Sequence, residues 1–298
     1  KMKKLFLLLL ISNYSFSQSF VPNAPELDLK SYILIEPTTN TIIAESNSTG
    51  LIEPASMTKV MTAYVLADQI GNDLISLDDK VLISKKAWKM GGSKMFIEVG
   101  KKVSIEDLLK GIIIQSGNDA AVAISEYVGG PEDGFVDLMN AYAVSLGMDN
   151  TDFRNSTGLP DEKHLTSSKD LATLTSNFMT KFPDIFALFK EKEFEYGGIS
   201  GNKFNRNKLL WRDETADGVK TGYTSSAGYC LIGSAIRGNM RLITVVAGSD
   251  TANKSFADTQ RLLEYGFRFY ATQKYFDANK EYTKAKVWGG NADQAALG

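Results

Sequence analysis

The chain has 298 residues, of which 43% are apolar and 23% charged, a globular balance that excludes intrinsic disorder and collagen-like repeats. Its 33 basic and 35 acidic residues leave a net charge of −2, which gives no electrostatic case for binding nucleic acid. One histidine, His164, and one cysteine, Cys230, exclude a His/Cys metal cluster and an intramolecular disulfide, and a Ser-His-Asp mechanism would have to use His164.

The first predicted element is a targeting segment over residues 1–17. Lysines at three of the first four positions precede an apolar run over 5–11, and small residues follow at Ser15 and Ser17. That order is typical of a signal peptide and its cleavage site, and it fits better than a buried N-terminal strand. The apolar run is too short to cross a bilayer. We therefore expect an exported protein that is soluble or peripheral to a membrane.

A hairpin and a series of helices are predicted next. Residues 31–46 contain two β-branched runs around a Pro-Thr-Thr-Asn turn, which predicts a β-hairpin. Residues 56–69 predict a helix with Ser56 at its start and one apolar face. Helical periodicity then recurs in four stretches, at 104–114, 118–128, 131–146 and 168–182. The first of these begins with an N-cap serine followed by acidic residues.

The last part of the chain returns to strands before a closing helix. Two β-rich runs, 227–236 and 240–248, are joined by Arg237-Gly238-Asn239, which predicts a second hairpin. Residues 254–270 again have helical periodicity. Strands, a helical block, more strands and a final helix indicate an α+β protein rather than a βαβ alternation. The segment after residue 275 is more polar, and we expect it to begin another domain.

A serine and a lysine at helical spacing form the first candidate catalytic pair. The chain lacks a Gly-x-Ser-x-Gly elbow, a His-Glu-x-x-His motif and a complete phosphate loop. In Ser56-Met57-Thr58-Lys59, the hydroxyl and the amine lie three residues apart and therefore on one helix face. Lysine acts as a base only if burial or a nearby cation lowers its pKa. A second such spacing, Ser200 to Lys203, lies in a Gly/Asn-rich stretch and predicts a turn.

Two further motifs strengthen this pair. Ser116-Gly117-Asn118 interrupts two apolar helical segments, where buried polar side chains must bond one another or a ligand. Lys220-Thr221-Gly222 lies near an expected strand. Taken singly, the first could be a helix–helix turn and the second an ordinary turn. Their joint order makes coincidence a poor explanation.

Together, Ser-x-x-Lys, Ser-x-Asn and Lys-Thr-Gly resemble the signature of the penicillin-binding proteins. The wider sequence resembles the low-molecular-mass D-alanyl-D-alanine carboxypeptidases of this group over roughly residues 25–298. The resemblance implies an α+β, β-lactamase/transpeptidase-like fold, with an antiparallel sheet flanked by helices, a helical subdomain and then the start of a small β-rich domain. The implied divisions are a signal peptide (1–17), a catalytic domain (25–272) and a truncated start of the β-rich domain (276–298).

The same resemblance implies roles for the motif residues. Ser56 would be the nucleophile, Lys59 its base and Ser116 a proton relay to the leaving group. Asn118 would hold Lys59 and the substrate amide. The carboxylate of the substrate would be bound by Lys220 and Thr221, and Gly222 would let the strand backbone approach the substrate closely. The backbone N–H groups of Ser56 and Tyr223 would form the oxyanion hole.

The activity implied is removal of the terminal D-alanine from peptidoglycan stem pentapeptides, with β-lactam antibiotics as covalent inhibitors and with neither metal nor cofactor. The family further implies a periplasmic location, peripheral on the inner membrane where a C-terminal amphipathic helix anchors the full-length protein. A transpeptidase or a β-lactam-acylated sensor of the same fold is the alternative. A class A β-lactamase fits less well, because a Glu-x-x-x-Asn loop after the Ser-x-Asn motif is missing.

The sequence departs from the family in two places. Relatives often have histidine after Lys-Thr-Gly, where this chain has Tyr223, and we expect a changed substrate rim. Relatives often carry an arginine before the closing helix, where this chain reads Ala252-Asn253-Lys254-Ser255. Lys254 is the candidate replacement charge. His164, in a polar loop, and Cys230, in an expected strand, are both interpreted as structural residues.

Overall fold

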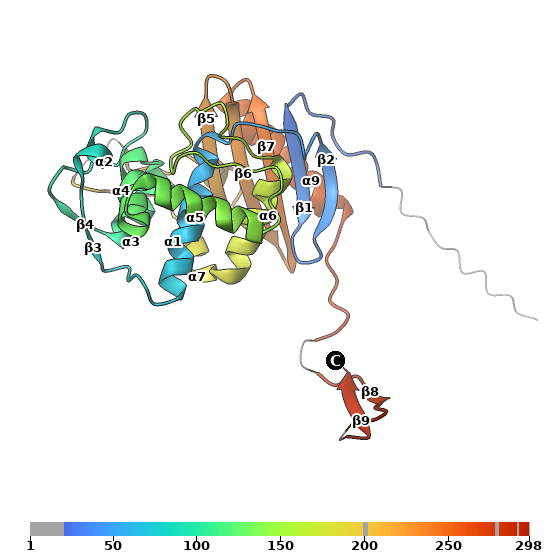
Figure 1. Ribbon diagram of the computed structural model, residues 1–298. Coiled ribbons are helices and arrows are strands. Elements are labelled where there is room, and N and C mark those ends of the chain that lie inside the picture. Colours follow the sequence, from blue (N-terminus) through green and yellow to red (C-terminus); the bar gives the residue numbers. More distant parts are fainter. Residues whose placement is uncertain (1–20, 199–201, 278–279, 291, 298) are drawn as a thin grey trace, which may run out of the picture.

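A five-stranded antiparallel sheet organises the chain in the computed structural model, which describes residues 21–198, 202–277, 280–290 and 292–297 (Figure 1). Its strands, in spatial order, are β2 (Thr41–Ser46), β1 (Ser31–Glu36), β7 (Met240–Ser249), β6 (Gly228–Arg237) and β5 (Ala216–Thr224). Both predicted hairpins are confirmed, although Arg237 belongs to β6 and the second turn is only two residues long. The expected signal peptide and part of the 200–203 motif lie outside the described residues.

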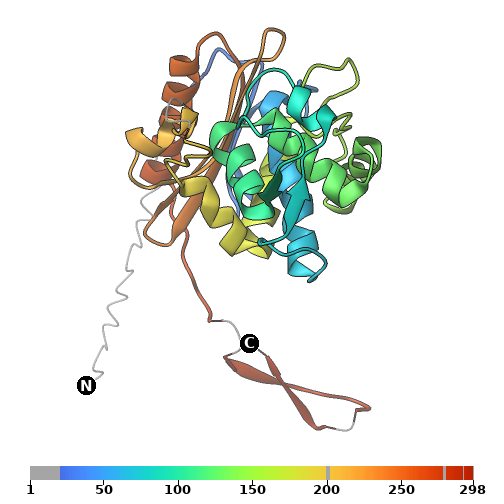
Figure 2. The same cartoon turned by 90° about the vertical axis from the view of Figure 1, so that its left-hand side faces the viewer.

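The sheet is covered by helices on both faces, as Figure 2 shows with α9 (Ala252–Phe269) on one side and the helical region on the other. Successive residues of β1 face opposite ways, as a strand requires. Tyr32 and Leu34 belong to the apolar cluster beneath α9, whereas Ile33 and Ile35 pack into the larger cluster on the opposite side. The central strands are therefore buried on both faces.

The helical region lies between β2 and β5 in the sequence. Its main helices are α1 (Lys59–Gly71), α3 (Ile105–Lys110), α4 (Asn118–Gly129), α5 (Glu132–Ser145) and α6 (Ser168–Lys181). Shorter elements are a 3₁₀ turn at Ala55–Thr58, β3 (Lys80–Leu82), α2 (Lys85–Lys89), β4 (Lys102–Ser104), a π-helical turn at Gly111–Gln115, α7 (Pro183–Phe186), a 3₁₀ turn at Ala187–Lys190 and α8 (Leu209–Arg212). The predicted helices are confirmed.

One predicted helix changes its form along its length. Ser104 caps it as expected, because its hydroxyl accepts a hydrogen bond from the N–H of Asp107. The α-helix ends at Lys110, and a π-helical turn then leads to Ser116. This widened turn brings the second sequence motif to the edge of the sheet.

A small hairpin follows α9. It consists of β8 (Thr283–Lys286) and β9 (Gln294–Leu297), which pair antiparallel (Figure 1). The divisions at 25–272 and 276–298 remain predictions. Within the described part of the chain, no helix is both long and apolar enough to cross a membrane. The observed architecture confirms the α+β class, with its antiparallel sheet and helical subdomain.

Candidate active site

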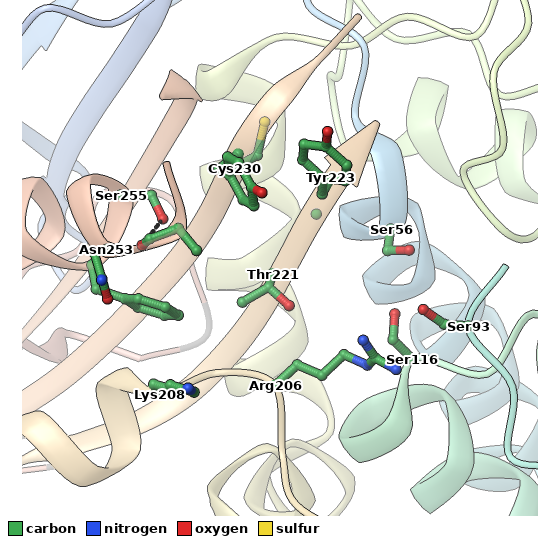
Figure 3. Close-up of a pocket in the computed structure, with 14 residues that line it drawn as sticks. Ser56, Ser93, Ser116, Arg206, Lys208, Thr221, Tyr223, Cys230, Asn253 and Ser255 are labelled. Atoms are coloured by element: carbon green, nitrogen blue, oxygen red, sulfur yellow. Dashed lines mark hydrogen bonds between the residues drawn. The ribbon is translucent and has the colours of Figure 1, made fainter. Parts of the chain in front are cut away.

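The three motifs meet at one pocket of about 300 Å³ between β5, the start of α1 and the start of α4 (Figure 3). Ser56 and Ser116 line it from the helical side, and Thr221, Gly222 and Tyr223 line it from β5. Antiparallel pairing places Lys-Thr-Gly within an edge strand, so its residues can face the helices across the pocket. The structure thus brings together residues that are up to 167 positions apart.

Lys59 is buried below Ser56 and has the geometry of a base. Its Nζ lies 3.1 Å from Ser56 Oγ, 2.7 Å from Asn118 Oδ1 and 2.6 Å from the carbonyl oxygen of Thr157. Burial, aided by the positive charge of Arg206, lowers the pKa of Lys59 to about 7. A neutral amine has two N–H groups and one lone pair. The two carbonyl oxygens can accept both N–H groups, which leaves the lone pair for the hydroxyl proton of Ser56.

Ser116 and Lys220 form a second hydroxyl–amine pair. Lys220 Nζ donates to Ser116 Oγ at 2.9 Å and to the carbonyl oxygen of Thr221 at 3.0 Å. Burial, together with the charges of Lys59 and Arg206, lowers the pKa of Lys220 well below its usual value. Lys220 lies behind Ser116 rather than in the pocket lining. Its predicted contact with a substrate carboxylate therefore remains a prediction.

A left-handed backbone conformation occurs at one of the two serines and immediately before the other. Ser116 has φ +60°, and Ala55, immediately before Ser56, has φ +46°. Such left-handed conformations are uncommon for residues with a side chain and tend to occur at functional sites. Hydrogen bonds hold the Ser116 turn in place, because the N–H of Gly117 donates to Gly111 O and that of Asn118 donates to Ser93 O.

Gly222 allows β5 to pass close to the turn that bears Ser56. A Cβ atom at this position would lie 3.0 Å from Pro54 O, 3.2 Å from Ala55 Cβ and 3.3 Å from Met57 Cγ. The close approach observed for this glycine is made to the turn that bears Ser56, and its predicted approach to the substrate stays a prediction. Tyr223, the next residue, is 56% exposed and stacks on Tyr229 at the mouth of the pocket.

A loop that closes another side of the pocket is held by α4. Asp119 is buried, and its carboxylate accepts the backbone N–H groups of Met95, Phe96 and Ile97. The same loop contributes Ser93 to the pocket lining. Asp119 directly follows the second motif, and no pattern in the sequence predicts that it anchors a segment more than twenty residues earlier.

The chain's one histidine and one cysteine lie close to the site, and their contacts are structural. His164 is buried below the turn that bears Ser56, where Nδ1 accepts the N–H of Arg154 and Nε2 therefore donates to Thr58 Oγ1 at 2.8 Å. Burial lowers the pKa of His164 to about 4. Cys230 borders the pocket, and burial raises its pKa to about 11, so the thiol stays protonated.

Two further groups at the site had no predicted role. The carbonyl of Thr157 contacts Lys59, and a backbone acceptor of this kind leaves no signal in the sequence. Arg206, an exposed residue, lines the pocket beside Ser116 (Figure 3). Lys254 does not line the pocket, since its ammonium group contacts Asp28 O and Asp258.

Comparison with known proteins places this geometry in context. Residues 18–251 match the family described as Peptidase_S11, D-alanyl-D-alanine carboxypeptidase. D-alanyl-D-alanine carboxypeptidase DacC of Escherichia coli (strain K12) is 39% identical over 298 residues, which cover 98% of this chain and 74% of that protein.

Solved structures show the same similarity. Penicillin binding protein 5 from Haemophilus influenzae has a TM-score of 0.88 at 35% identity, over 93% of this chain and 81% of that chain. Penicillin-Binding Protein D2 from Listeria monocytogenes, solved in the cefotaxime-bound form, has a TM-score of 0.74 at 30% identity, over 83% of this chain and 99% of that chain. These similarities confirm the fold predicted from the three motifs.

Proposed function

Because this chain belongs to the Peptidase_S11 family of D-alanyl-D-alanine carboxypeptidases and is a serine-type carboxypeptidase, we propose that it removes the terminal D-alanine of peptidoglycan stem pentapeptides through an acyl-enzyme on Ser56. The observation that carries the proposal is the contact of a buried, low-pKa Lys59 with Ser56 Oγ. Such a pair activates a hydroxyl for nucleophilic attack.

In acylation, Ser56 Oγ attacks the carbonyl carbon between the two terminal D-alanines while its proton passes to Lys59 Nζ. The backbone N–H groups of Ser56 and Tyr223 are the proposed donors to the oxyanion that develops on the carbonyl oxygen. When the C–N bond breaks, the leaving D-alanine nitrogen takes a proton. Ser116, with Lys220 bonded to its hydroxyl, is placed to deliver that proton. The proton that Lys59 took from Ser56 replaces it through the Ser116–Lys220 pair, so that both amines are neutral again before deacylation.

Deacylation consumes one water. The water adds to the ester carbonyl of the acyl-enzyme, gives a proton to a neutral amine, and the Ser56–acyl bond breaks as Ser56 Oγ regains its proton. Lys59 and Lys220 are the amines with lowered pKa at this point, so each is a candidate base. The products are a tetrapeptide and free D-alanine, with the enzyme returned to its starting state.

β-Lactams are the proposed covalent inhibitors, since they present a strained amide to the same serine. The Listeria relative solved in its cefotaxime-bound form supports this extension. The signal-peptide pattern over residues 1–17 supports export to the periplasm, where this substrate occurs. We assign residues 25–272 to the catalytic unit and 276–298 to the start of a second, β-rich one.

Product analysis with a pentapeptide substrate tests the proposal. The purified chain from residue 20 onward is incubated with the peptide in the presence and absence of an amine acceptor. We expect free D-alanine and tetrapeptide in both cases. A crosslinked product as the main species would instead identify a transpeptidase. If no product forms, the result contradicts enzymatic activity toward this substrate.

Ser56→Ala is the matched variant. It should abolish both D-alanine release and labelling by a fluorescent penicillin. Ser226→Ala, which removes an exposed hydroxyl that donates a hydrogen bond to Glu53, should retain both. Continued labelling of Ser56→Ala would show that the nucleophile is another residue.

A further inference from the structure

Positive charge is concentrated in one part of the helical region, residues 80–102, which we call the basic lobe. Seven lysines and one acid, Glu98, give this lobe a net charge of +6, while the whole chain has −2, so all other positions together carry −8. The lysines of the basic lobe are Lys80, Lys85, Lys86, Lys89, Lys94, Lys101 and Lys102. A surface of one sign on a body of the opposite sign orients a protein toward an anionic partner.

The backbone of the basic lobe turns its lysine side chains to the solvent. In the two-stranded sheet, Val81 pairs with Val103 and both are buried, so Lys80 and Lys102 lie on the opposite, exposed face. In α2, Ala87 is buried and all three lysines are exposed. Figure 1 shows β3, β4 and α2 together at the end of the helical region away from the five-stranded sheet. The charges therefore belong to one surface that folded elements support.

Most of these lysines have no acidic partner. Among the residues that the structure describes, Lys86 alone of the basic lobe forms an ion pair, at 2.7 Å with Glu132 of α5. The masked-out positions of the sequence, which lie outside the described residues, contain no Asp or Glu. Asp79, next to the lobe, accepts hydrogen bonds from Ser76 and Tyr127 instead. Because unpaired like charges repel one another, a polyanion that binds here removes an unfavourable term.

The basic lobe borders the catalytic pocket. Its loop after α2 contributes Ser93 to the pocket lining. The next residue, Lys94, is held at both ends, because its carbonyl oxygen accepts from Asn202 Nδ2 at 2.7 Å and its ammonium group donates to Trp88 O at 3.2 Å. The carboxylate of Asp119 fixes the residues that follow. A long substrate that occupies the pocket therefore has the basic lobe as a direct neighbour.

The proposed substrate is itself part of a polyanion. Each uncleaved stem peptide ends in a free carboxylate, and a peptidoglycan strand carries many stems, so negative charge recurs along its length. One stem at a time enters the pocket, and the carboxylates of its neighbours stay outside. An anionic lipid surface also attracts lysines, but the strand is favoured because the basic lobe borders the pocket into which its stems must fit.

We propose that the basic lobe binds the carboxylates of neighbouring stem peptides on the same peptidoglycan strand, and so retains the protein on polymeric substrate while one stem is cleaved. This inference rests on the proposed carboxypeptidase function and adds that the polymer, rather than a single stem, is the substrate this chain selects. The attraction is spread over several exposed lysines. Each lysine therefore contributes little, and the whole effect depends strongly on ionic strength.

The test compares a free pentapeptide with soluble, uncrosslinked glycan strands that carry the same pentapeptide. The lobe variant combines Lys85→Gln, Lys89→Gln and Lys102→Gln. At low salt, kcat/KM for D-alanine release from strands should fall by about fivefold or more, because steering by a full charged surface changes association rates by about 10- to 1,000-fold. The free pentapeptide should change by less than about twofold, since isolated exposed charges contribute little. At about 1 M salt, where the screening length is about 3 Å, the loss on strands should disappear.

Two further variants make the result specific to charge and to place. The matched control combines Lys163→Gln, Lys169→Gln and Lys190→Gln, which removes the same three charges from exposed positions outside the basic lobe. It should keep the preference for strands. Arginine at the three lobe positions keeps the charge and should keep the preference as well.

Equal losses of the lobe variant on both substrates would show that the lobe acts on the pocket and would overturn the proposal. An unchanged rate on strands, or an equal loss in the matched control, would overturn it too. So would lobe-dependent sedimentation with phosphatidylglycerol vesicles but not with strands, which would identify a lipid surface.

Failure of the wild-type protein to release D-alanine from the free pentapeptide would contradict the proposed function and not the role of the basic lobe. Sedimentation of Ser56→Ala with insoluble peptidoglycan, with and without the three lobe substitutions, then tests the lobe without turnover. Weaker sedimentation with the substitutions supports the proposal, and equal sedimentation overturns it.

Discussion

Substitution of Gly222 by alanine tests the close packing between β5 and the turn that bears Ser56. The new methyl group would meet Pro54 O at 3.0 Å, Ala55 Cβ at 3.2 Å and Met57 Cγ at 3.3 Å. Favourable contacts between carbon atoms lie at about 3.5–4.0 Å, so the turn or the strand must move by roughly a few tenths of an ångström. Overpacking of this kind costs about 1–3 kcal/mol of stability.

The displaced turn includes Ser56, so catalysis should suffer more than stability. A misplacement of about 1 Å costs about 100-fold in rate, and the smaller movement here predicts a loss of about 5- to 50-fold in acylation by a fluorescent penicillin. Gly91→Ala is the matched control, because a Cβ atom there meets nothing within 4 Å and the backbone carbonyl is kept. Acylation of Gly222→Ala within twofold of wild type, with an unchanged melting temperature, would refute the packing argument.

Three other substitutions probe separate parts of the site. Asn118→Ala removes one of the two carbonyl acceptors of Lys59 and should slow acylation by at least about tenfold; an unchanged rate would mean that Asn118 does not orient the amine. Asp119→Ala strands three backbone N–H groups and should lower the free energy of unfolding by about 3 kcal/mol or more in urea titrations; a change below about 1 kcal/mol would contradict an anchoring role. The pKa of His164 is about 4 in the folded protein and 6.5 ordinarily, so the unfolded state binds the proton first as pH falls. The free energy of unfolding should therefore decrease by about 3 kcal/mol between these two pH values. In His164→Gln that decrease, measured by denaturation at each pH, should disappear.

Much of the fold followed from local sequence patterns. The two hairpins and the main helices have strong periodicity and clear turn residues, and they lie where the patterns predicted. The Ser104 cap was predicted because its hydroxyl and the acids after it act within a single turn. Local chemistry of this kind needs no knowledge of distant residues.

The sequence predicted which residues form the site but not the contacts between them. The motifs named the residues, while their contacts depend on tertiary structure. Lys59 reaches Thr157 O across 98 positions, and Lys220 reaches Ser116 across 104. His164 was placed in a polar loop, yet it is buried, because that loop folds under the turn that bears Ser56 and the ring contacts Thr58.

The search for a cation to replace the arginine that relatives carry before the closing helix shows the same limit of sequence-based prediction. From the sequence, Lys254 was the candidate because it is the cation nearest the position where relatives have arginine. In the fold, the start of α9 turns Lys254 toward Asp28, and Arg206 from a different loop faces the pocket. Nearness in sequence therefore did not identify the cations that line the pocket.

The pH dependence of Ser56 acylation tests the central claim, that neutral Lys59 is the base. The second-order rate constant for a penicillin is measured from about pH 5.5 to 9.5, over which the antibiotic carboxylate stays ionised. Because the active form is the unprotonated amine, the rate should rise about tenfold per pH unit below a midpoint near 7 and level off above about pH 8. A rate that is constant between pH 6 and 8, or one that still rises toward the ordinary lysine value of 10.5, would contradict the account.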